Sequence, residues 1–371
     1  MERSKIICMF NLLCGNFNPN FSTRTFMRNL LLLFLVLPLL FTIGNAQMDA
    51  QYTMYMFNRQ ALNPAYTGSL EATNMTLLGR AQWVGIPGAP KTSTFAVSGF
   101  LKGINSGIGG HIIADQIGPL RTLGANLAYA YHLHFSDRAI LNIGIQGGFY
   151  QKGLFVPKDG WLYAEMTTNT DPLANTGDAT SFVPDIGSGL YFHLKRRGIT
   201  TPAYPQDAFY VGGSVGHILE PSLKGLILNG NSIARVRRSF NATVGGSIPI
   251  KRNIFLGPSA FFRTDLASWQ LDLTTNLYIS PMVFGINYRG GLYNFQDSNF
   301  RNVSDSFSGI VGFNANTSLF IGYSYDYTVS PLTQFTSGSH ELIISYTFPT
   351  ITRPDIRVLD PTMFRTDFDR E

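Results

Sequence analysis

From about residue 73 onward the chain alternates between apolar and polar side chains with a period of two. Between 268 and 279 every second position is mostly large and apolar, while the positions in between carry Gln, Asp, Thr and Asn. The same alternation recurs at 121–135, 139–151 and 318–328. Because successive side chains of a strand point to opposite faces of a sheet, this pattern predicts long β-strands with one apolar and one polar face.

Fourteen segments show this alternation, and together they predict a barrel. They are 73–82, 92–100, 106–115, 121–135, 139–151, 182–194, 207–217, 236–248, 253–265, 268–279, 281–289, 304–315, 318–328 and 338–348. Strands of soluble sandwiches average about five or six residues, and their polar faces carry Lys, Glu and Arg. Here the polar face is mainly Gly, Ser, Asn and Thr, which line barrel lumens, and the apolar face fits a lipid-facing band. We therefore predict an all-β fold, a transmembrane antiparallel β-barrel of about 14 strands.

The connections predict how this barrel sits in its membrane. If the first strand rises from the periplasm, short turns such as 136–138, 279–281 and 316–317 fall on the periplasmic side. Most of the longer connections then fall on the outer side, which is the usual arrangement in outer-membrane barrels. The stretch 195–206 is an exception, because a 12-residue connection stands on the side where a short turn is expected, and a strand near it is the one open to miscounting. An even number of strands places both termini in the periplasm.

The first 46 residues predict a leader. A 12-residue apolar run follows Arg28 and precedes small residues that end at Ala46, which is the pattern of a secretory signal peptide cleaved after Ala46. The run is too short to span a bilayer, which takes about 20 residues. Met27 is a natural start, so 27–46 is the expected signal peptide and 1–26 a possible upstream mis-start.

The remaining boundaries follow from where the alternation begins and ends. The barrel is expected at 73–348, preceded by a short periplasmic or plug segment at 47–72. Residues 349–371 follow the last strand and hold three prolines and alternating charge. This composition predicts an extended periplasmic tail.

Composition and charge narrow the possible functions. Only 14% of the 371 residues are charged, against about 25% in an ordinary soluble domain. The net charge of +5 falls to +2 after residue 46, because four basic residues and one acidic residue lie in the leader. A chain so balanced has no basic face for phosphates, so nucleic acid is excluded as a partner. Both cysteines, Cys8 and Cys14, lie in the leader, which leaves the mature chain without disulfides.

Two patterns resemble catalytic or metal-binding motifs, and each has a simpler interpretation. Residues 212–216 match G-x-S-x-G, but they lie inside an alternating strand with no helix after it, so Ser214 is not expected to be a nucleophile. His132 and His134 share one face, but no third metal ligand can be assigned beside them. We predict no catalytic site, metal or cofactor. A lipid-modifying barrel enzyme would depend on Ser214 or His132.

Three stretches carry a resemblance to a known family. Tyr-Met-Phe-Asn at 55–58 is followed by Asn-Pro-Ala-Tyr at 63–66 and then by a Gly-Ser pair. Residues 80–90 read RAQWVGIPGAP, and 338–348 read GSHELIISYTF. On these motifs the chain resembles the PorP/SprF family of Bacteroidetes outer-membrane proteins. The signature residues are Gly68, Trp83, Pro87, Gly338, His340, Glu341 and Phe348.

The resemblance implies an outer-membrane component of type IX secretion and gliding motility. It implies periplasmic partners of that system, including a peptidoglycan-binding lipoprotein, and a large secreted adhesin with a C-terminal sorting domain. Arg59 stands where many members have proline, and the tail after Phe348 is longer than a plain closing strand. These departures leave open whether the chain serves the core motor or one cargo.

Two regions are the expected partner-binding sites. The aromatic residues of 47–72 are expected to pack into the barrel mouth or against a partner; the candidates are Tyr55, Met56, Phe57, Asn63, Pro64 and Tyr66. The long outer loop 152–181 carries Trp161 and Tyr163, which suit either a mobile lid or a docking surface. We expect a non-enzymatic barrel in outer-membrane lipid that anchors or presents partner proteins. The alternative is a plugged outer-membrane channel for small hydrophobic solutes.

Overall fold

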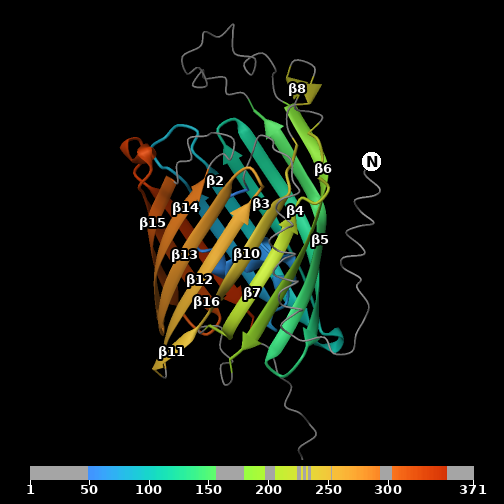
Figure 1. The fold of residues 1–371 in the computed structure, drawn as a ribbon, viewed down its shortest axis with the longest axis vertical. Coiled ribbons are helices and arrows are strands. Elements are labelled where there is room, and N and C mark those ends of the chain that lie inside the picture. The colour runs from blue at the N-terminus through green and yellow to red at the C-terminus, as the bar shows by residue number, and fades with distance from the viewer. Residues whose placement is uncertain are drawn as a thin grey trace, which may run out of the picture. The chain divides into compact units, whose positions relative to one another are not determined.

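The described part of the chain forms an antiparallel β-barrel with a short N-terminal segment inside it (Figure 1). The computed structural model describes residues 49–155, 179–196, 205–223, 227–228, 231–232, 235–251, 253–292 and 303–348. The strands are β1 (Asn74–Ala81), β2 (Lys91–Leu101), β3 (Ser106–Ile117), β4 (Leu120–His134), β5 (Ala139–Leu154), β6 (Ala179–Lys195), β7 (Asp207–Gly216), β8 (Ile227–Leu228), β9 (Asn231–Ser232), β10 (Ser239–Gly246), β11 (Ile248–Lys251), β12 (Ile254–Thr264), β13 (Trp269–Ile279), β14 (Met282–Leu292), β15 (Val303–Asn314), β16 (Leu319–Thr328) and β17 (Ser339–Thr347). Short 3₁₀ helices are η2 (Tyr55–Phe57), η3 (Arg59–Ala61), η4 (Pro64–Tyr66), η5 (Lys102–Ile104) and η6 (Pro331–Gln334).

Fourteen wall strands close into a ring, which confirms the predicted fold. β10 and β11 are two parts of one wall strand, and both pair with β12. β10 also pairs with β7, and β1 pairs with β17, where Arg80 lies opposite Glu341. Each of the fourteen wall strands therefore pairs with another strand on both sides. Such a ring satisfies its backbone hydrogen bonds without water, which strands in lipid require.

The wall departs from the predicted segments at 236–248. The strand there is interrupted at Ser247, whose N–H donates to the carbonyl of Ala208 in β7 (3.1 Å). Between its pairings with β10 and with β11, β12 contains Pro258, which has no N–H to donate. The ladder between this strand and β12 is therefore broken locally, and the strand divides into β10 and β11.

The two ends of the barrel differ in their connections. Short turns such as 135–138 and 315–318 lie at one end, which we call the turn end. At the other end, which we call the loop end, β5 ends at Leu154 and β6 begins at Ala179, and β14 ends at Leu292 and β15 begins at Val303. β6 pairs directly with β7 on either side of 195–206, so no wall strand was missed at this long connection.

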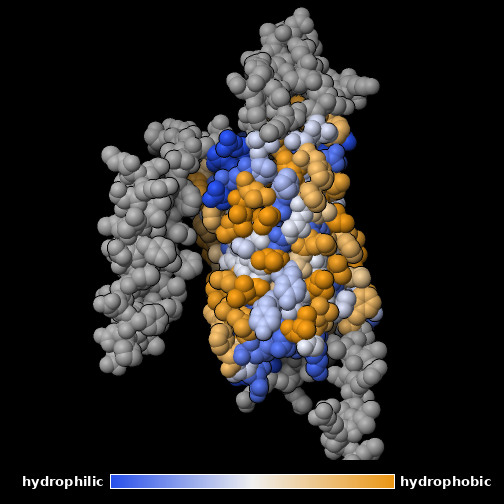
Figure 2. Space-filling model, turned by 90° about the vertical axis from the view of Figure 1, so that its right-hand side faces the viewer, coloured by the Kyte–Doolittle hydropathy of each residue, from blue (hydrophilic) through white to orange (hydrophobic). Residues whose placement is uncertain are grey.

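The inner and outer faces of the wall differ as the alternation predicted. Large apolar side chains point outward, such as Leu127 with 75% of its surface exposed and Ile286 with 71%. Asn126, Asn142 and Thr274 are buried on the inner face. Figure 2 shows one side of this wall, with hydrophobic residues over much of its middle and strongly hydrophilic ones toward its two ends. No helix in the described ranges has the length and apolar character needed to cross a bilayer.

Residues 49–72, which we call the plug, run through the ring from the loop end to the turn end. Asp49 contacts His217, which directly follows β7 at the loop end (3.2 Å). At the turn end, the carbonyl of Thr73 accepts a hydrogen bond from the N–H of Phe348 (2.8 Å). The first and last described residues lie at opposite ends, because the plug crosses the lumen before β1 begins.

Candidate functional site

The plug is held inside the ring by charged side chains of the wall, which lie in the loop-end half of their strands. Glu341 of β17 accepts hydrogen bonds from the backbone N–H groups of Thr53 (2.8 Å) and Met54 (2.7 Å). The Thr53 hydroxyl donates to Asp326 of β16 (2.8 Å). Arg80 of β1 forms ion pairs with Asp326 (2.6 Å) and Glu341 (3.0 Å). One threonine of the plug thus sits in a buried network that joins the first and last strands of the wall.

A second arginine completes this network. Arg289 of β14 has no exposed surface, and its Nε donates to Asp272 of β13 (2.8 Å). Its Nη2 donates to the carbonyl of Tyr52 and to the hydroxyl of Thr53, each at 3.1 Å. We call Arg80, Asp272, Arg289, Asp326 and Glu341 the clamp. Buried charges are costly unless they are paired and hydrogen-bonded, and here both the partner charges and the plug supply those bonds.

The second half of the plug is held by close packing on glycines of the wall. A Cβ added to Gly107 of β3 would lie 2.0 Å from the carbonyl oxygen of Thr67. A Cβ added to Gly144 of β5 would lie 2.2 Å from the backbone nitrogen of Ala65. Only residues without a side chain allow the plug backbone to approach this closely. Locally, Asn63 caps η4 by accepting a hydrogen bond from the N–H of Ala65 (2.9 Å).

The residues that resembled catalytic or metal-binding groups also bind the plug. The Ser214 hydroxyl donates to the carbonyl of Leu62 (2.6 Å), and it lies within β7 rather than on a turn before a helix. His132 Nε2 lies 2.9 Å from the carbonyl of Thr67, while His134 is exposed. Within the described residues, no three His, Cys, Asp or Glu side chains are grouped closely enough to hold a metal ion.

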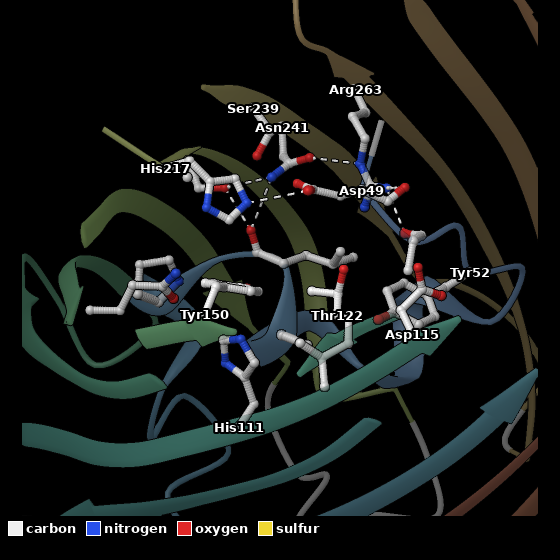
Figure 3. A pocket seen from close by; sticks show the side chains of 18 of the residues that line it. Asp49, Tyr52, His111, Asp115, Thr122, Tyr150, His217, Ser239, Asn241 and Arg263 are labelled. Carbon is white, nitrogen blue, oxygen red and sulfur yellow. Dashed lines mark hydrogen bonds and ion pairs between the residues drawn. The ribbon is translucent and has the colours of Figure 1, made fainter. Parts of the chain in front are cut away.

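A polar cavity of about 80 Å³ lies between the plug and the wall near the loop end. Figure 3 shows His217 and Asp49 pointing toward each other across it, with Arg263 beside Asp49. His217 lies 2.7 Å from Asp185 through Nδ1 and 3.2 Å from Asp49 through Nε2. Arg263 donates to the backbone carbonyl of Ala50 (2.6 Å). This cavity therefore surrounds the point where the plug meets the loop end.

The electrostatics of this contact fix the charge of His217. Burial alone would lower the pKa of His217, but the carboxylates of Asp49 and Asp185 outweigh burial and raise the pKa to about 10. Burial would raise the pKa of Asp49, but His217 and Arg263 hold it well below its usual range. His217 is therefore cationic and Asp49 anionic at neutral pH, and an ion pair anchors the first described residue of the plug.

A second cavity, of about 150 Å³, lies between the plug and the wall at the turn end. Arg59 of the plug contributes its guanidinium to the lining, and Tyr66 and Tyr210 contribute aromatic rings. The Arg59 guanidinium carbon lies 3.9 Å from the centre of the Tyr210 ring, and Nη1 pairs with Asp207 (3.2 Å). This cavity combines an arginine with several aromatic side chains.

The six partner-binding candidates of the plug all lie inside the ring. Tyr55 stacks on Phe261 with ring centres 5.1 Å apart, and Phe57 packs against Phe320 at 4.5 Å. Met56, Asn63 and Pro64 are buried, and Tyr66 is half-buried. Their packing is against the wall, so a partner-binding role for them stays a prediction. Trp161 and Tyr163 lie outside the described residues.

The signature residues mostly support the joins between the first and last strands. Glu341 belongs to the clamp, and Gly338 has a positive φ of 99°. The N–H of Trp83 donates to the hydroxyl of Ser339 (3.0 Å). Pro87 lies in the β1–β2 connection and His340 on β17, where its Nδ1 lies 2.6 Å from the Tyr323 hydroxyl. Of the remaining two, Gly68 of the plug has a φ of 76° and packs against Gly107, and the N–H of Phe348 donates to the carbonyl of Thr73, the residue after the plug.

Sequence reasoning missed the clamp residues Arg80, Asp272, Arg289 and Asp326 as a site. A signal was present, because each is a charged residue on the polar face of an alternating strand. Charged side chains that face a lumen need partners there. For two of them, Arg289 and Asp326, the partner lies in a segment more than 200 residues away in the chain, which local patterns cannot indicate.

Comparison with known proteins decides the family. The sequence profile described as type IX secretion system membrane protein PorP/SprF matches residues 44–346. The chain belongs to the PorP/SprF family. This confirms the resemblance seen in the sequence, and it assigns the PorP/SprF protein to a family of outer-membrane secretion components.

Solved structures similar to this PorP/SprF protein are outer-membrane barrels of low sequence identity. The CymD monoaromatic hydrocarbon channel is 12% identical with a TM-score of 0.44, covering 82% of this chain and 95% of that one. A TodX monoaromatic hydrocarbon channel mutant is 8% identical with a TM-score of 0.44, covering 80% and 94%. CdiB from Acinetobacter baumannii is 9% identical with a TM-score of 0.40, covering 75% and 60%. A search of curated proteins gave no match.

Proposed function

We propose that this PorP/SprF protein is an outer-membrane part of the type IX secretion and gliding machinery that anchors periplasmic partners and supports the export and surface attachment of a large adhesin. The observation that carries the proposal is the match to the family over residues 44–346. The plug supports it, because a lumen occupied by a clamped segment suits an anchoring barrel better than an open pore.

The proposed orientation places the turn end in the periplasm and the loop end outside the cell. This follows the rule that outer-membrane barrels have short periplasmic turns and long outer loops. The periplasmic partners, including a peptidoglycan-binding lipoprotein, would then meet the turn end and the tail at 349–371. The adhesin, with its C-terminal sorting domain, would meet the outer loops, where 152–181 carries Trp161 and Tyr163.

The proposed maturation removes residues 1–46 by cleavage after Ala46, so the mature chain begins immediately before the plug. We propose no enzymatic role, because Ser214 and His132 are both bonded to plug carbonyls. A phospholipase assay on purified protein tests this point. Hydrolysis that disappears in Ser214→Ala would contradict it.

Affinity capture after cross-linking tests the main proposal. The full chain carries a tag in native cells, and outer membranes are cross-linked and solubilised. We expect to recover periplasmic components of the secretion system, including a lipoprotein that binds peptidoglycan, or a large adhesin with a sorting domain. A tagged outer-membrane barrel from another family serves as the control. Recovery of this barrel alone would overturn the proposal.

The alternative is a plugged channel for small hydrophobic solutes. It predicts that deletion of the gene abolishes uptake of such a solute while secretion continues. Our proposal predicts the reverse, with secretion lost and uptake unchanged. The two outcomes are separated by measuring both in the same deletion strain.

A further inference from the structure

The turn-end cavity is a candidate ligand-binding site, and the proposed function does not depend on it. It is lined by residues from the plug and from wall strands at both ends of the chain, and its volume is about 150 Å³. Its rim includes Pro205, just before β7, and Thr317 and Ser318, in the β15–β16 turn. These residues place the mouth of the cavity at the turn end of the barrel.

Arg59 supplies a charged hydrogen-bond donor to this cavity. Arg59 uses Nη1 to donate to the Tyr191 hydroxyl (2.9 Å) and to Asp207 (3.2 Å). Its Nε is buried and has no partner among the described residues. The phenols of Tyr66, Tyr210 and Tyr278 surround it: all three lie close enough to interact electrostatically with Arg59 or with one another. A guanidinium ringed by phenols is a donor set that suits an anion.

The carboxylate already present does not saturate these donors. Asp207 accepts from three residues: Arg59 (3.2 Å), Tyr191 (3.0 Å) and His193, whose Nδ1 lies 2.9 Å away. Its negative charge is therefore shared among several donors on the wall side of the cavity. Arg59 keeps capacity for a second carboxylate, and a planar guanidinium binds such groups with directional, charge-assisted hydrogen bonds.

Apolar and aromatic side chains form part of the remaining lining, together with polar ones such as Asn276 and Ser345. Phe57 and Phe320 pack at 4.5 Å between ring centres, and Met56 and Leu70 lie beside them. Apolar and aromatic walls with a few polar groups are the usual make-up of a binding pocket. The ligand that complements this lining has an aromatic or aliphatic side chain beside its carboxylate.

We propose that the turn-end cavity binds the free C-terminal carboxylate of a polypeptide whose last residue is aromatic, with Arg59 pairing the carboxylate. The choice of a periplasmic protein as its source rests on the proposed function, because that places the turn end in the periplasm. Binding of the peptide itself does not depend on that orientation. Failure of the peptide test and failure of the affinity capture are therefore separate results.

Two model peptides test the proposal on the full chain in detergent micelles. Acetyl-Ala-Ala-Phe with a free carboxylate is compared with the same peptide amidated at its C-terminus, by isothermal titration calorimetry. The peptides differ only in the charge and the hydrogen-bonding of one terminal group. We expect the free acid to bind at least about tenfold more tightly than the amide, the scale of one charge-assisted hydrogen bond.

Variants locate the binding. Arg59→Gln should weaken the free acid about tenfold and leave the amide unchanged, because it removes the charge but keeps a donor. Arg263→Gln, which removes a guanidinium from the loop-end cavity, is the matched control and should leave binding unchanged. Tyr278→Phe removes only a hydroxyl and should weaken the acid a few-fold, about the effect of one neutral hydrogen bond. It gives a second readout if Arg59→Gln does not fold.

Four other results would each overturn the proposal. Equal affinity for acid and amide would remove the carboxylate from the interaction. Loss of binding in Arg263→Gln but not in Arg59→Gln would place the peptide in the other cavity. Acetyl-phenylalanine binding as tightly as the peptide would assign the cavity to small carboxylates. Binding seen only after truncation of 349–371 would assign it to the tail of this chain.

Discussion

The two halves of the plug are held in different ways. Residues 49–58 are held by charged side chains, with Glu341 accepting from the backbone of Thr53 and His217 pairing with Asp49. Residues 59–72 pack closely on the wall, which presents glycines where a side chain would collide with the plug backbone, and polar contacts such as Ser214 with Leu62 add to this packing. Buried charges distinguish the first half, and close backbone packing on glycines distinguishes the second. The two modes should fail under different mutations and conditions.

Breaking the charged half should have the largest effect. Glu341→Ala leaves Arg80 buried without one of its partners and leaves two plug amides without an acceptor. Removing one member of a buried pair typically costs about 3–5 kcal/mol, so the free energy of unfolding should fall by that amount. The measurement is urea unfolding of the lipid-reconstituted barrel, followed by tryptophan fluorescence.

The control for this change is an exposed ion pair. Glu220 pairs with Arg238 at 2.9 Å, and both side chains are more than a third exposed. Glu220→Ala should change the free energy of unfolding by less than about 1 kcal/mol. If Glu341→Ala and Glu220→Ala gave equal losses, the clamp would have no special role.

Filling the glycine-lined half should have an intermediate effect. Gly144→Ala places a Cβ 2.2 Å from the backbone nitrogen of Ala65, far closer than two such atoms can approach. Overpacking of this kind typically costs about 1–3 kcal/mol, and here the plug must move because the colliding atom is backbone. We expect faster proteolysis of the plug and a lower free energy of unfolding, with the first half still bound.

Gly147→Ala is the matched control, because it lies on the same strand and its Cβ would have nothing within 4 Å. Its effect should be within about 0.5 kcal/mol. Equal proteolysis of the two variants would show that close packing does not hold the second half of the plug.

The smallest effect concerns pH at the loop end. Because the folded chain raises the pKa of His217 from 6.5 to about 10, its ion pairs stabilise the fold fully below about pH 6.5. This stabilisation is lost as the pH rises through about 10. The difference in unfolding free energy between wild type and His217→Gln should shrink over that range. A difference that stays constant with pH would place the stabilisation elsewhere.

The wall could be predicted from the sequence because each strand carries its own pattern. Leu127 and Asn126 point to opposite faces for a reason that is visible within one strand. The path of the plug could not be predicted in this way. Thr53 and Glu341 are 288 positions apart, and the polar face of a strand indicates a lumen without indicating what fills it.

The candidate site residues show the same difference between local patterns, which the sequence carries, and tertiary contacts, which it does not. Tyr55 and Phe57 were recognised as buried or partner-binding aromatics, and their contacts with Phe261 and Phe320 needed the folded ring. The break at Ser247 was missed because it depends on Pro258 of the neighbouring strand. The local pattern predicts no nucleophile at Ser214, and the hydrogen bond from Ser214 to Leu62 is a tertiary contact that this pattern does not indicate.

The pairing of Arg80 with Glu341 has a consequence for how the molecule is assembled. These residues face each other across the seam between β1 and β17, which are the first and last strands of the wall. Zipping that seam therefore also completes the receptor for Thr53. A ring closed around an empty interior would bury the same charges without the hydrogen bonds of Thr53, so closing the seam is energetically coupled to the presence of the plug.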